Sequence, residues 1–407
     1  MRETPSASHI PKRYAILALS VLLQALTFGI LIYGFTFWVE PWTKEFDVSR
    51  SWVMAIVTGH MISLGICSAF LGPLVDRVDA RLAVIGGLVA FSFGLALISA
   101  ATSPLAIAAV YMLVMPVGAV FAGPLIAMTL VARNFTHRRG LAFGITSAGT
   151  SLGGVIFPFV ITWLLVEFGW RSAHIWLATV PALVLIPLAW WTLRDEGSRE
   201  ATVASSGMDP FTFSQLVRAR EFWLLSFAFL LVGLTFGSLQ FNLRPYASDI
   251  GITLEATAAV ASGMSLAMLI GKLGFGALMD RYDHHGLFAV GCAAMVVGAL
   301  LLLFEGGLPF VASGYFLLGL GAGAFLPLKG GLFSAAFGVQ AVGRSIGLAQ
   351  PIVALYALGP PLFALLHDRS DGYSVGIVAA MVGAVVCIPL VLALRRTQAM
   401  PIQGALG

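Results

Sequence analysis

Twelve long apolar stretches dominate the sequence, and they restrict the chain to structures that cross a lipid bilayer. Each is about twenty residues or longer, the length that an α-helix needs to span roughly 30 Å of hydrocarbon. The stretches are 14–38, 52–75, 82–102, 104–132, 140–166, 173–193, 221–244, 256–279, 286–305, 308–336, 343–366 and 373–394. Most of them lack the alternation of a barrel strand, so they predict an all-α membrane protein with twelve transmembrane helices.

The composition fits a chain that faces lipid. Hydrophobic residues make up 59% of the sequence and charged residues 10%, whereas soluble domains carry roughly a quarter charged residues. The cysteines Cys67, Cys292 and Cys387 all lie in apolar stretches, which is typical of small buried packing residues. We therefore expect neither disulfides nor a metal or cofactor. Basic residues mark the loops and form no cluster, so we expect no nucleic-acid partner.

The basic residues predict the orientation of the chain in the membrane. If the amino terminus is cytoplasmic, that side holds sixteen lysines and arginines and the opposite side five. The five are Lys44, Arg50, Arg171, Arg244 and Arg369. Positive charge favours the cytoplasmic side, so both termini are predicted to be cytoplasmic in a multi-pass protein of the cell inner membrane. We expect a monomer.

Two halves of the chain repeat each other. Gly72–Arg77 (GPLVDR) matches Gly276–Arg281 (GALMDR), and Gly118 and Pro124 match Gly321 and Pro327 at nearly the same offset. A polar segment lies between the halves. The sequence therefore predicts two pseudo-symmetric six-helix bundles, at 1–193 and 221–407, joined by a flexible cytoplasmic linker at 194–220. Membrane proteins built from repeats usually bind substrate between the halves near the midplane.

The first copy of this loop resembles the signature of the major facilitator superfamily. Its residues run Gly72-Pro-Leu-Val-Asp76-Arg77-Val-Asp79-Ala-Arg81. Two further stretches, Phe46–Trp52 and Arg138–Arg171, are similar to the bacterial monocarboxylate transporter and oxalate–formate antiporter-like branch. The resemblance implies the major facilitator fold and transport by alternating access. It also implies that Asp76, Arg77 and Arg81, with Asp280 and Arg281 in the second copy, gate the cytoplasmic side; the alternative is that these charges only anchor the loops.

Two lysines, Lys272 and Lys329, lie within apolar stretches of the second half. A lysine at the bilayer centre costs about 2.5–3.5 kcal/mol on the insertion scale. The sequence places Lys272 roughly 12 Å from the cytoplasmic end of its helix and predicts that Lys329 is the shallower of the two. No aspartate or glutamate lies at comparable depth, and the repeat aligns the lysines with Ser68 and Ile126. We therefore expect both ammonium groups to bind an anionic substrate, although Lys329 could instead snorkel to the interface.

The resemblance bears on the substrate as well. The branch usually has an arginine in the eighth helix that binds the substrate carboxylate, and Lys272 stands at that place. Animal monocarboxylate transporters have an acidic residue one turn earlier, where this chain has Met268, and a lysine where this chain has aromatic residues near Phe35–Trp38. The resemblance therefore does not imply proton symport for this chain. Protons and a counter-anion are both kept as candidates for the coupled species.

Polar and aromatic residues in the predicted helices could complete a pocket. They could equally bond to a neighbouring helix. The candidates are Gln24, Phe28, Tyr33, Thr146, Thr150, Gln350 and Tyr356. Tyr356 is favoured because Gly359-Pro-Pro361, which predicts a break in the helix, follows it.

Motifs that point to enzymes lack the structural context that their chemistry needs. Gly149–Gly153 matches the nucleophile elbow and Gly319–Ala324 a loose dinucleotide fingerprint, but both lie inside predicted membrane helices. They indicate close helix packing, and we expect no catalytic site.

These observations favour a secondary active transporter of small organic anions, mono- or dicarboxylates, that works as a symporter or an anion exchanger. One alternative is a carrier or efflux pump of the same fold for a non-carboxylate solute. A transporter-derived sensor without net flux is a further alternative.

Overall fold

The computed structural model describes residues 9–135, 139–194, 213–279, 281–337 and 342–398. It divides into two compact units, Met1–Ala204 and Ser205–Gly407. The described residues are helical and contain no β-strand. Each unit is described by itself below.

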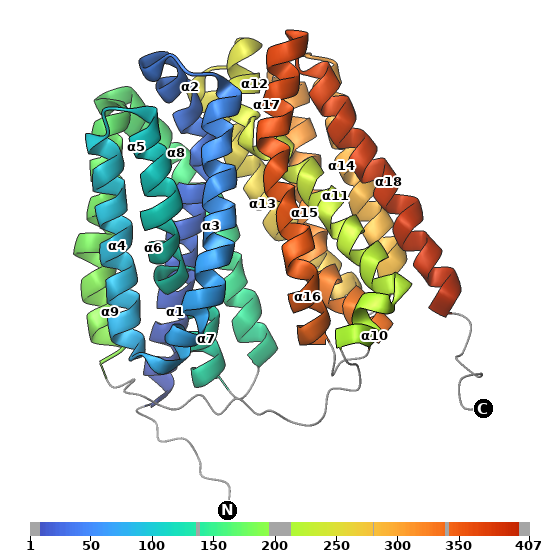
Figure 1. The fold of residues 1–407 in the computed structure, drawn as a ribbon, viewed down its shortest axis with the longest axis horizontal. Helices are drawn as coiled ribbons and strands as arrows, with labels where there is room; N and C mark the ends of the chain where they lie inside the picture. Colours follow the sequence, from blue (N-terminus) through green and yellow to red (C-terminus); the bar gives the residue numbers. More distant parts are fainter. Residues whose placement is uncertain (1–8, 136–138, 195–212, 280, 338–341, 399–407) are drawn as a thin grey trace, which may run out of the picture. The chain divides into compact units, whose positions relative to one another are not determined.

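Unit 1 contains nine α-helices and three short π-helical turns among its described residues (Figure 1). The helices are α1 (His9–Phe28), α2 (Phe35–Phe46), α3 (Arg50–Arg77), α4 (Ala80–Ala100), α5 (Pro104–Ala109), α6 (Met115–Ala122), α7 (Pro124–Asn134), α8 (Arg139–Val180) and α9 (Ile186–Thr192). The π turns are η1 (Gly29–Tyr33), η2 (Val110–Val114) and η3 (Pro181–Leu185), and they join α1 to α2, α5 to α6 and α8 to α9.

Unit 2 contains nine α-helices and one 3₁₀ turn among its described residues. The helices are α10 (Phe213–Arg218), α11 (Arg220–Phe241), α12 (Leu243–Asp249), α13 (Leu254–Leu278), α14 (His284–Leu303), α15 (Leu308–Phe337), α16 (Val342–Ala354), α17 (Gly359–Ser370) and α18 (Ser374–Gln398). The 3₁₀ turn η5 (Leu355–Leu358) separates α16 from α17.

Eleven helical stretches of the described residues are long and apolar enough to cross a membrane. The longest, Gly144–Thr192, contains two of the predicted crossings, which meet at Gly169. Gly169 has φ 71° and ψ 169°, a backbone conformation that residues other than glycine rarely adopt. Divided there, the eleven stretches become the twelve crossings expected from the sequence. The predicted all-α membrane fold is confirmed.

Glycines set how closely the helices of each unit approach. A methyl group at Gly149 or Gly153 of α8 would meet backbone oxygens of α1, at Val21 and Ala25. The same holds in unit 2, where α15 packs against both α13 and α14. There a methyl group at Gly319 would meet the backbone oxygen of Met264. The glycine motifs that resembled enzyme signatures are therefore helix-packing faces.

The predicted domain boundaries stay a prediction. Most of the predicted linker, 195–212, lies outside the described residues, and the last part of the linker forms the short helix α10.

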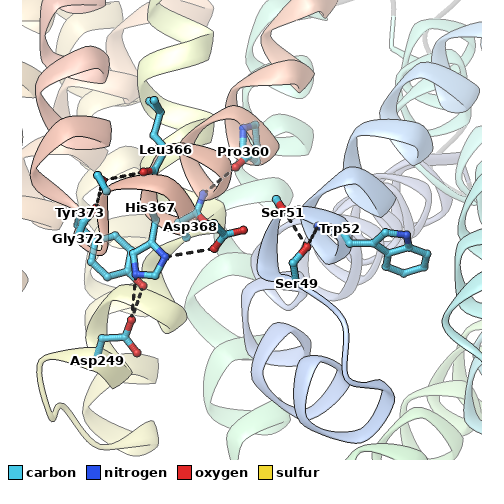
Figure 2. Close-up of polar contacts among 12 residues, drawn as sticks. Ser49, Ser51, Trp52, Asp249, Pro360, Leu366, His367, Asp368, Gly372 and Tyr373 are labelled. Atoms are coloured by element: carbon cyan, nitrogen blue, oxygen red, sulfur yellow. Dashed lines mark hydrogen bonds and ion pairs between the residues drawn. The ribbon is translucent and has the colours of Figure 1, made fainter.

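At the start of α3, the Ser49 hydroxyl accepts a hydrogen bond from the backbone N–H of Trp52 at 3.1 Å (Figure 2). This cap satisfies one of the free N–H groups of the helix and fixes where α3 begins.

Candidate functional site

Two of the predicted site residues contact each other in unit 2. Lys329 on α15 donates a hydrogen bond from Nζ to Oε1 of Gln350 on α16, at 2.9 Å. The same ammonium nitrogen lies 5.9 Å from the centre of the Phe229 ring on α11. Among the described residues, Lys329 forms no ion pair with a carboxylate. Both partners are neutral, so they orient the ammonium group without cancelling its charge.

Lys272 lies where α13 and α15 approach each other closely through glycine. A methyl group at Gly271 would meet the backbone oxygen of Leu320, and one at Gly323 would meet that of Met268. The same methyl group at Gly323 would lie 2.8 Å from the backbone nitrogen of Lys272. The backbone at Lys272 therefore lies directly against α15. Lys272 is half-buried and already takes part in an interaction within the protein.

The relative depth of the two lysines in the membrane stays a prediction, because helix bounds alone define no membrane plane. α13 ends at Leu278, six residues after Lys272, whereas α15 continues to Phe337, eight residues after Lys329. At 1.5 Å per residue these separations are about 9 Å and about 12 Å. Lys272 therefore lies nearer to its helix end than the expected 12 Å. The predicted stretches, 256–279 and 308–336, each end within one residue of these helices.

Tyr356 lies in a break between two helices, as the sequence predicted. It belongs to η5, which separates α16 from α17 directly before Gly359-Pro-Pro361. Its ring packs on α11, where a methyl group at Gly233 would lie 2.8 Å from the Tyr356 Cβ. Gly237, one turn later, faces the same ring. The two glycines leave room for this tyrosine beside a segment whose backbone departs from the α-helix.

The candidates of unit 1 divide into buried and half-buried side chains. Gln24 is 1% exposed and Tyr33 4% exposed, whereas Phe28 and Thr150 are half-buried. The Nε2 of Gln24 has no hydrogen-bond partner among the described residues. Gln24 thus keeps an unused donor inside the unit, which is the property expected of a residue that binds a solute.

The two threonine hydroxyls bond within their own helix. Thr150 donates to the Ser147 oxygen at 2.8 Å, and Thr146 to the Ala142 oxygen at 2.9 Å. This is the usual way in which a hydroxyl is satisfied in a membrane helix. Each oxygen can still accept a hydrogen bond, so these contacts leave the role of the threonines a prediction.

The gating residues are only partly visible. Asp280 and the side chains of Asp76 and Arg77 lie outside the described residues. Arg81, in the first turn of α4, stacks on Trp190 of α9, with Cζ 3.1 Å from the ring centre. Its Nε has no hydrogen-bond partner within the described part of the chain. Arg281 is exposed. Arg81 is thus held by an aromatic face and keeps donors for another partner.

Buried aromatic rings occupy the segment where animal monocarboxylate transporters place a lysine. Trp38 lies 4.3 Å from the ring centre of His174, and Trp42 lies 5.9 Å from that of Tyr111. All four side chains are 1% exposed or less. These four aromatic side chains therefore form part of the core of unit 1.

Sequence reasoning missed two polar networks that join distant segments. In unit 1, Glu45 at the end of α2 accepts hydrogen bonds from Trp170 and Arg171 of α8. In unit 2, Asp249 of α12 accepts a hydrogen bond from Tyr373 and lies beside His367 (Figure 2). The partners are separated by more than a hundred residues in the chain, so no local pattern connects them.

The family model of the Major Facilitator Superfamily matches residues 17–355 and 245–404 of the chain. The chain belongs to this superfamily. Its family is one of membrane transporters, so the protein is a membrane-spanning transporter and not an enzyme. The superfamily membership expected from the loop Gly72–Arg81 is confirmed.

Two curated relatives cover much of the chain. The MFS transporter asaE of Aspergillus flavus is 29% identical over 347 residues, which are 80% of this chain and 72% of that protein. The Oxalate:formate antiporter of Oxalobacter formigenes is 28% identical over 268 residues, which are 65% of this chain and 62% of that protein. The second relative confirms the resemblance to the branch that the motifs indicated.

A solved structure shows the same fold. A bacterial homolog of the human lysosomal transporter Spinster matches with a TM-score of 0.74 and covers 96% of this chain and 98% of its own. The two sequences are 16% identical. This likeness supports the architecture and carries no information on the substrate.

Proposed function

We propose that the protein is a secondary active transporter of small organic anions, mono- or dicarboxylates, which works by alternating access as a symporter or an anion exchanger. The single observation that carries this proposal is the contact between Lys329 and Gln350. An ammonium group inside a membrane helix is held at 2.9 Å by a neutral amide, so its positive charge is kept for another partner.

Lys272 supports the same proposal from the neighbouring helix. It lies on α13, which packs directly on α15, the helix that carries Lys329. Two cations on adjacent helices suit a dianion, or one carboxylate that each lysine contacts in turn. Lysine presents a point charge, whereas arginine presents a planar fork, so recognition here would tolerate different carboxylate geometries.

Further residues complete the proposed cycle. Gln24, Phe28, Tyr33, Thr150 and Tyr356 would line the path, and Asp76, Arg77, Arg81, Asp280 and Arg281 would gate it. We infer from the distribution of basic residues that the protein resides in the cell inner membrane with both termini cytoplasmic. Protons or a counter-anion would be the coupled species.

A binding measurement tests the proposal without knowledge of the transport direction. The purified protein is heated with oxalate, formate, lactate or succinate at two pH values, and the unfolding temperature is recorded. A ligand that binds the folded state raises this temperature by mass action. We expect at least one carboxylate to stabilise the wild-type protein, and Lys272→Gln and Lys329→Gln each to remove most of that stabilisation.

Lys44→Gln is the matched control, because Lys44 is exposed and pairs with Glu40 at the end of α2. Stabilisation that survives in Lys44→Gln but not in Lys272→Gln supports an anion carrier. Stabilisation that is equal in all these variants would contradict the role of the lysines and would favour a carrier of a non-carboxylate solute.

A further inference from the structure

Five buried side chains of unit 1 carry polar atoms that the proposed function does not use. We call them the aromatic–histidine cluster. Its members are Trp38 and Trp42 on α2, His60 on α3, Tyr111 in η2 and His174 on α8. Each of these side chains is 1% exposed or less. The cluster is therefore closed to bulk water and to lipid.

The rings of the aromatic–histidine cluster form a continuous series of contacts. The ring centres of Trp38 and His174 lie 4.3 Å apart. Trp42 lies 6.0 Å from His174 and 5.9 Å from Tyr111, measured between ring centres. The ring of His60 lies 5.9 Å from that of Tyr111. Because each ring contacts another ring with a polar atom, the five side chains form one polar site that joins four elements of the unit.

One polar atom of every member has no hydrogen-bond partner among the described residues. These atoms are Trp38 Nε1, Trp42 Nε1, His60 Nε2, Tyr111 Oη and His174 Nε2. Buried polar groups in proteins are nearly always hydrogen-bonded, because a group that loses its hydration without gaining a partner destabilises the fold. The site therefore calls for a partner that the described part of the chain does not supply.

The bonds of the two imidazole rings define the hydrogen-bonding chemistry of that partner. His60 Nδ1 lies 2.8 Å from the backbone oxygen of Tyr111, and His174 Nδ1 lies 2.7 Å from that of Trp170. A carbonyl oxygen only accepts hydrogen bonds, so Nδ1 carries the proton in both rings. In a neutral imidazole the other nitrogen, Nε2, is then an acceptor.

The remaining polar atoms add donors to these acceptors. The indole N–H groups of Trp38 and Trp42 only donate, and the hydroxyl of Tyr111 both donates and accepts. An anion would match the donors and leave the imidazole nitrogens unpaired, whereas a cation would do the reverse. Water donates and accepts, and a buried water molecule typically makes about three hydrogen bonds to such groups. The mixed set is therefore complementary to water.

We propose that the aromatic–histidine cluster binds ordered water inside unit 1. The water accepts hydrogen bonds from the indoles, donates to the imidazoles and so connects α2, α3, η2 and α8. Such a bridge is nearly as favourable as a direct hydrogen bond. None of the five residues belongs to the candidates for the substrate or the gate, and the proposal does not rest on anion transport.

Radiolytic labelling of the full-length wild-type protein in lipid nanodiscs tests the site. A brief X-ray pulse converts water into hydroxyl radicals, which react with side chains beside the water molecules that produced them. Mass spectrometry then measures the modification of each aromatic residue. We expect Tyr111 and Trp42 to be modified although they are buried, because the bound water supplies the radical in place.

Tyr315 is the matched control, because it is 1% exposed and its hydroxyl donates to the backbone oxygen of Leu239 at 2.9 Å. It should stay unmodified, while the exposed Tyr282 should react with bulk water. Modification of Tyr111 and Trp42 that does not exceed that of Tyr315 would overturn the proposal.

The stability of Tyr111→Phe provides a second test, because its sign depends on the water. If the Tyr111 hydroxyl bonds to water, its removal loses a hydrogen bond and lowers the unfolding temperature, as Tyr315→Phe should also do. If the hydroxyl has no partner, its removal relieves a buried unpaired group and raises that temperature. A rise or no change in Tyr111→Phe would contradict the proposal. The labelling uses the wild type, so it decides even if the variant fails to fold.

Discussion

Lys329 donates a hydrogen bond from Nζ to Oε1 of Gln350 at 2.9 Å, and this contact joins α15 to α16 within unit 2. The amide fixes the position of the ammonium group. It also leaves the positive charge uncompensated, which a carboxylate in its place would not do. An amide at position 350 therefore keeps the charge of Lys329 for an anionic substrate, whereas an acid at this position would neutralise it.

Gln350→Glu should abolish most of the affinity for carboxylates. The new carboxylate would pair with Lys329 and repel an anionic ligand, and we expect about a tenfold loss of affinity, or about 1.4 kcal/mol. Calorimetric or thermal-shift titration with the best-binding carboxylate measures it. Gln215→Glu is the control, because it adds the same charge on the exposed face of α10. Equal affinity in the two variants would contradict this role of Gln350.

Gly323→Ala should destabilise unit 2. The added methyl group would meet the backbone of Met268 and Lys272 on α13, so the helices must separate, at a cost of about 1–3 kcal/mol. Gly330→Ala on the same helix is the control, because nothing lies within 4 Å of its added methyl group. Thermal unfolding of the purified protein in detergent measures both. If the two variants unfold at the same temperature, the backbone contact between α13 and α15 does not hold Lys272 in place.

Trp190→Leu should slow transport without weakening substrate binding. Arg81 stacks on this ring with Cζ 3.1 Å from its centre, and the loss of the aromatic face removes what orients the guanidinium for gating. Uptake rate and binding affinity are measured separately, with Trp191→Leu, at the neighbouring exposed tryptophan of α9, as the control. A fall in affinity with an unchanged rate at saturation would argue against a gating role.

Alkaline pH should weaken the fold through Tyr246. Burial, together with the nearby charge of Glu305, raises the pKa of Tyr246 to about 12, from a usual value near 10. A pKa raised in the folded state stabilises it fully below pH 10, and this contribution is lost as pH rises from about 10 to about 12. The hydroxyl also donates to the Leu302 oxygen at 2.6 Å.

Unfolding temperatures measured between pH 9 and pH 12 test this expectation. Tyr246→Phe should show a smaller alkaline decrease than the wild type, although it starts from a lower value because the hydrogen bond is lost. Tyr282→Phe, at an exposed tyrosine, is the control and should follow the wild type. If the unfolding temperature of Tyr246→Phe falls as much between pH 9 and pH 12 as that of the wild type, Tyr246 is not the cause of the alkaline destabilisation.

The fold was predictable because membrane helices depend on local properties. Apolar length predicted the crossings, and the run Gly359-Pro-Pro361 predicted the break that the structure has at Leu355–Leu358. Helix ends were less predictable, because an apolar stretch does not mark the last hydrogen-bonded residue. The stretch predicted at 14–38, for example, ends eight residues before α2 does, at Phe46.

The site was predictable as a set of residue types and not as a set of contacts. A lysine within a long apolar stretch is unusual enough to be noticed in a sequence, and so both lysines were found. The bond from Lys329 to Gln350 depends on how two helices pack, which no local pattern encodes. The group around His367 was missed because Asp249 and Tyr373 are 124 residues apart in the chain.

Uptake of ¹⁴C-labelled oxalate and formate into proteoliposomes tests the central claim most directly. The wild type, Lys44→Gln and the double variant Lys272→Gln/Lys329→Gln are compared at equal amounts of reconstituted protein, with and without unlabelled carboxylate inside. The account predicts uptake by the wild type and Lys44→Gln and none above background by the double variant. Uptake by the double variant at the wild-type rate would contradict the claim that these two ammonium groups bind an anionic substrate.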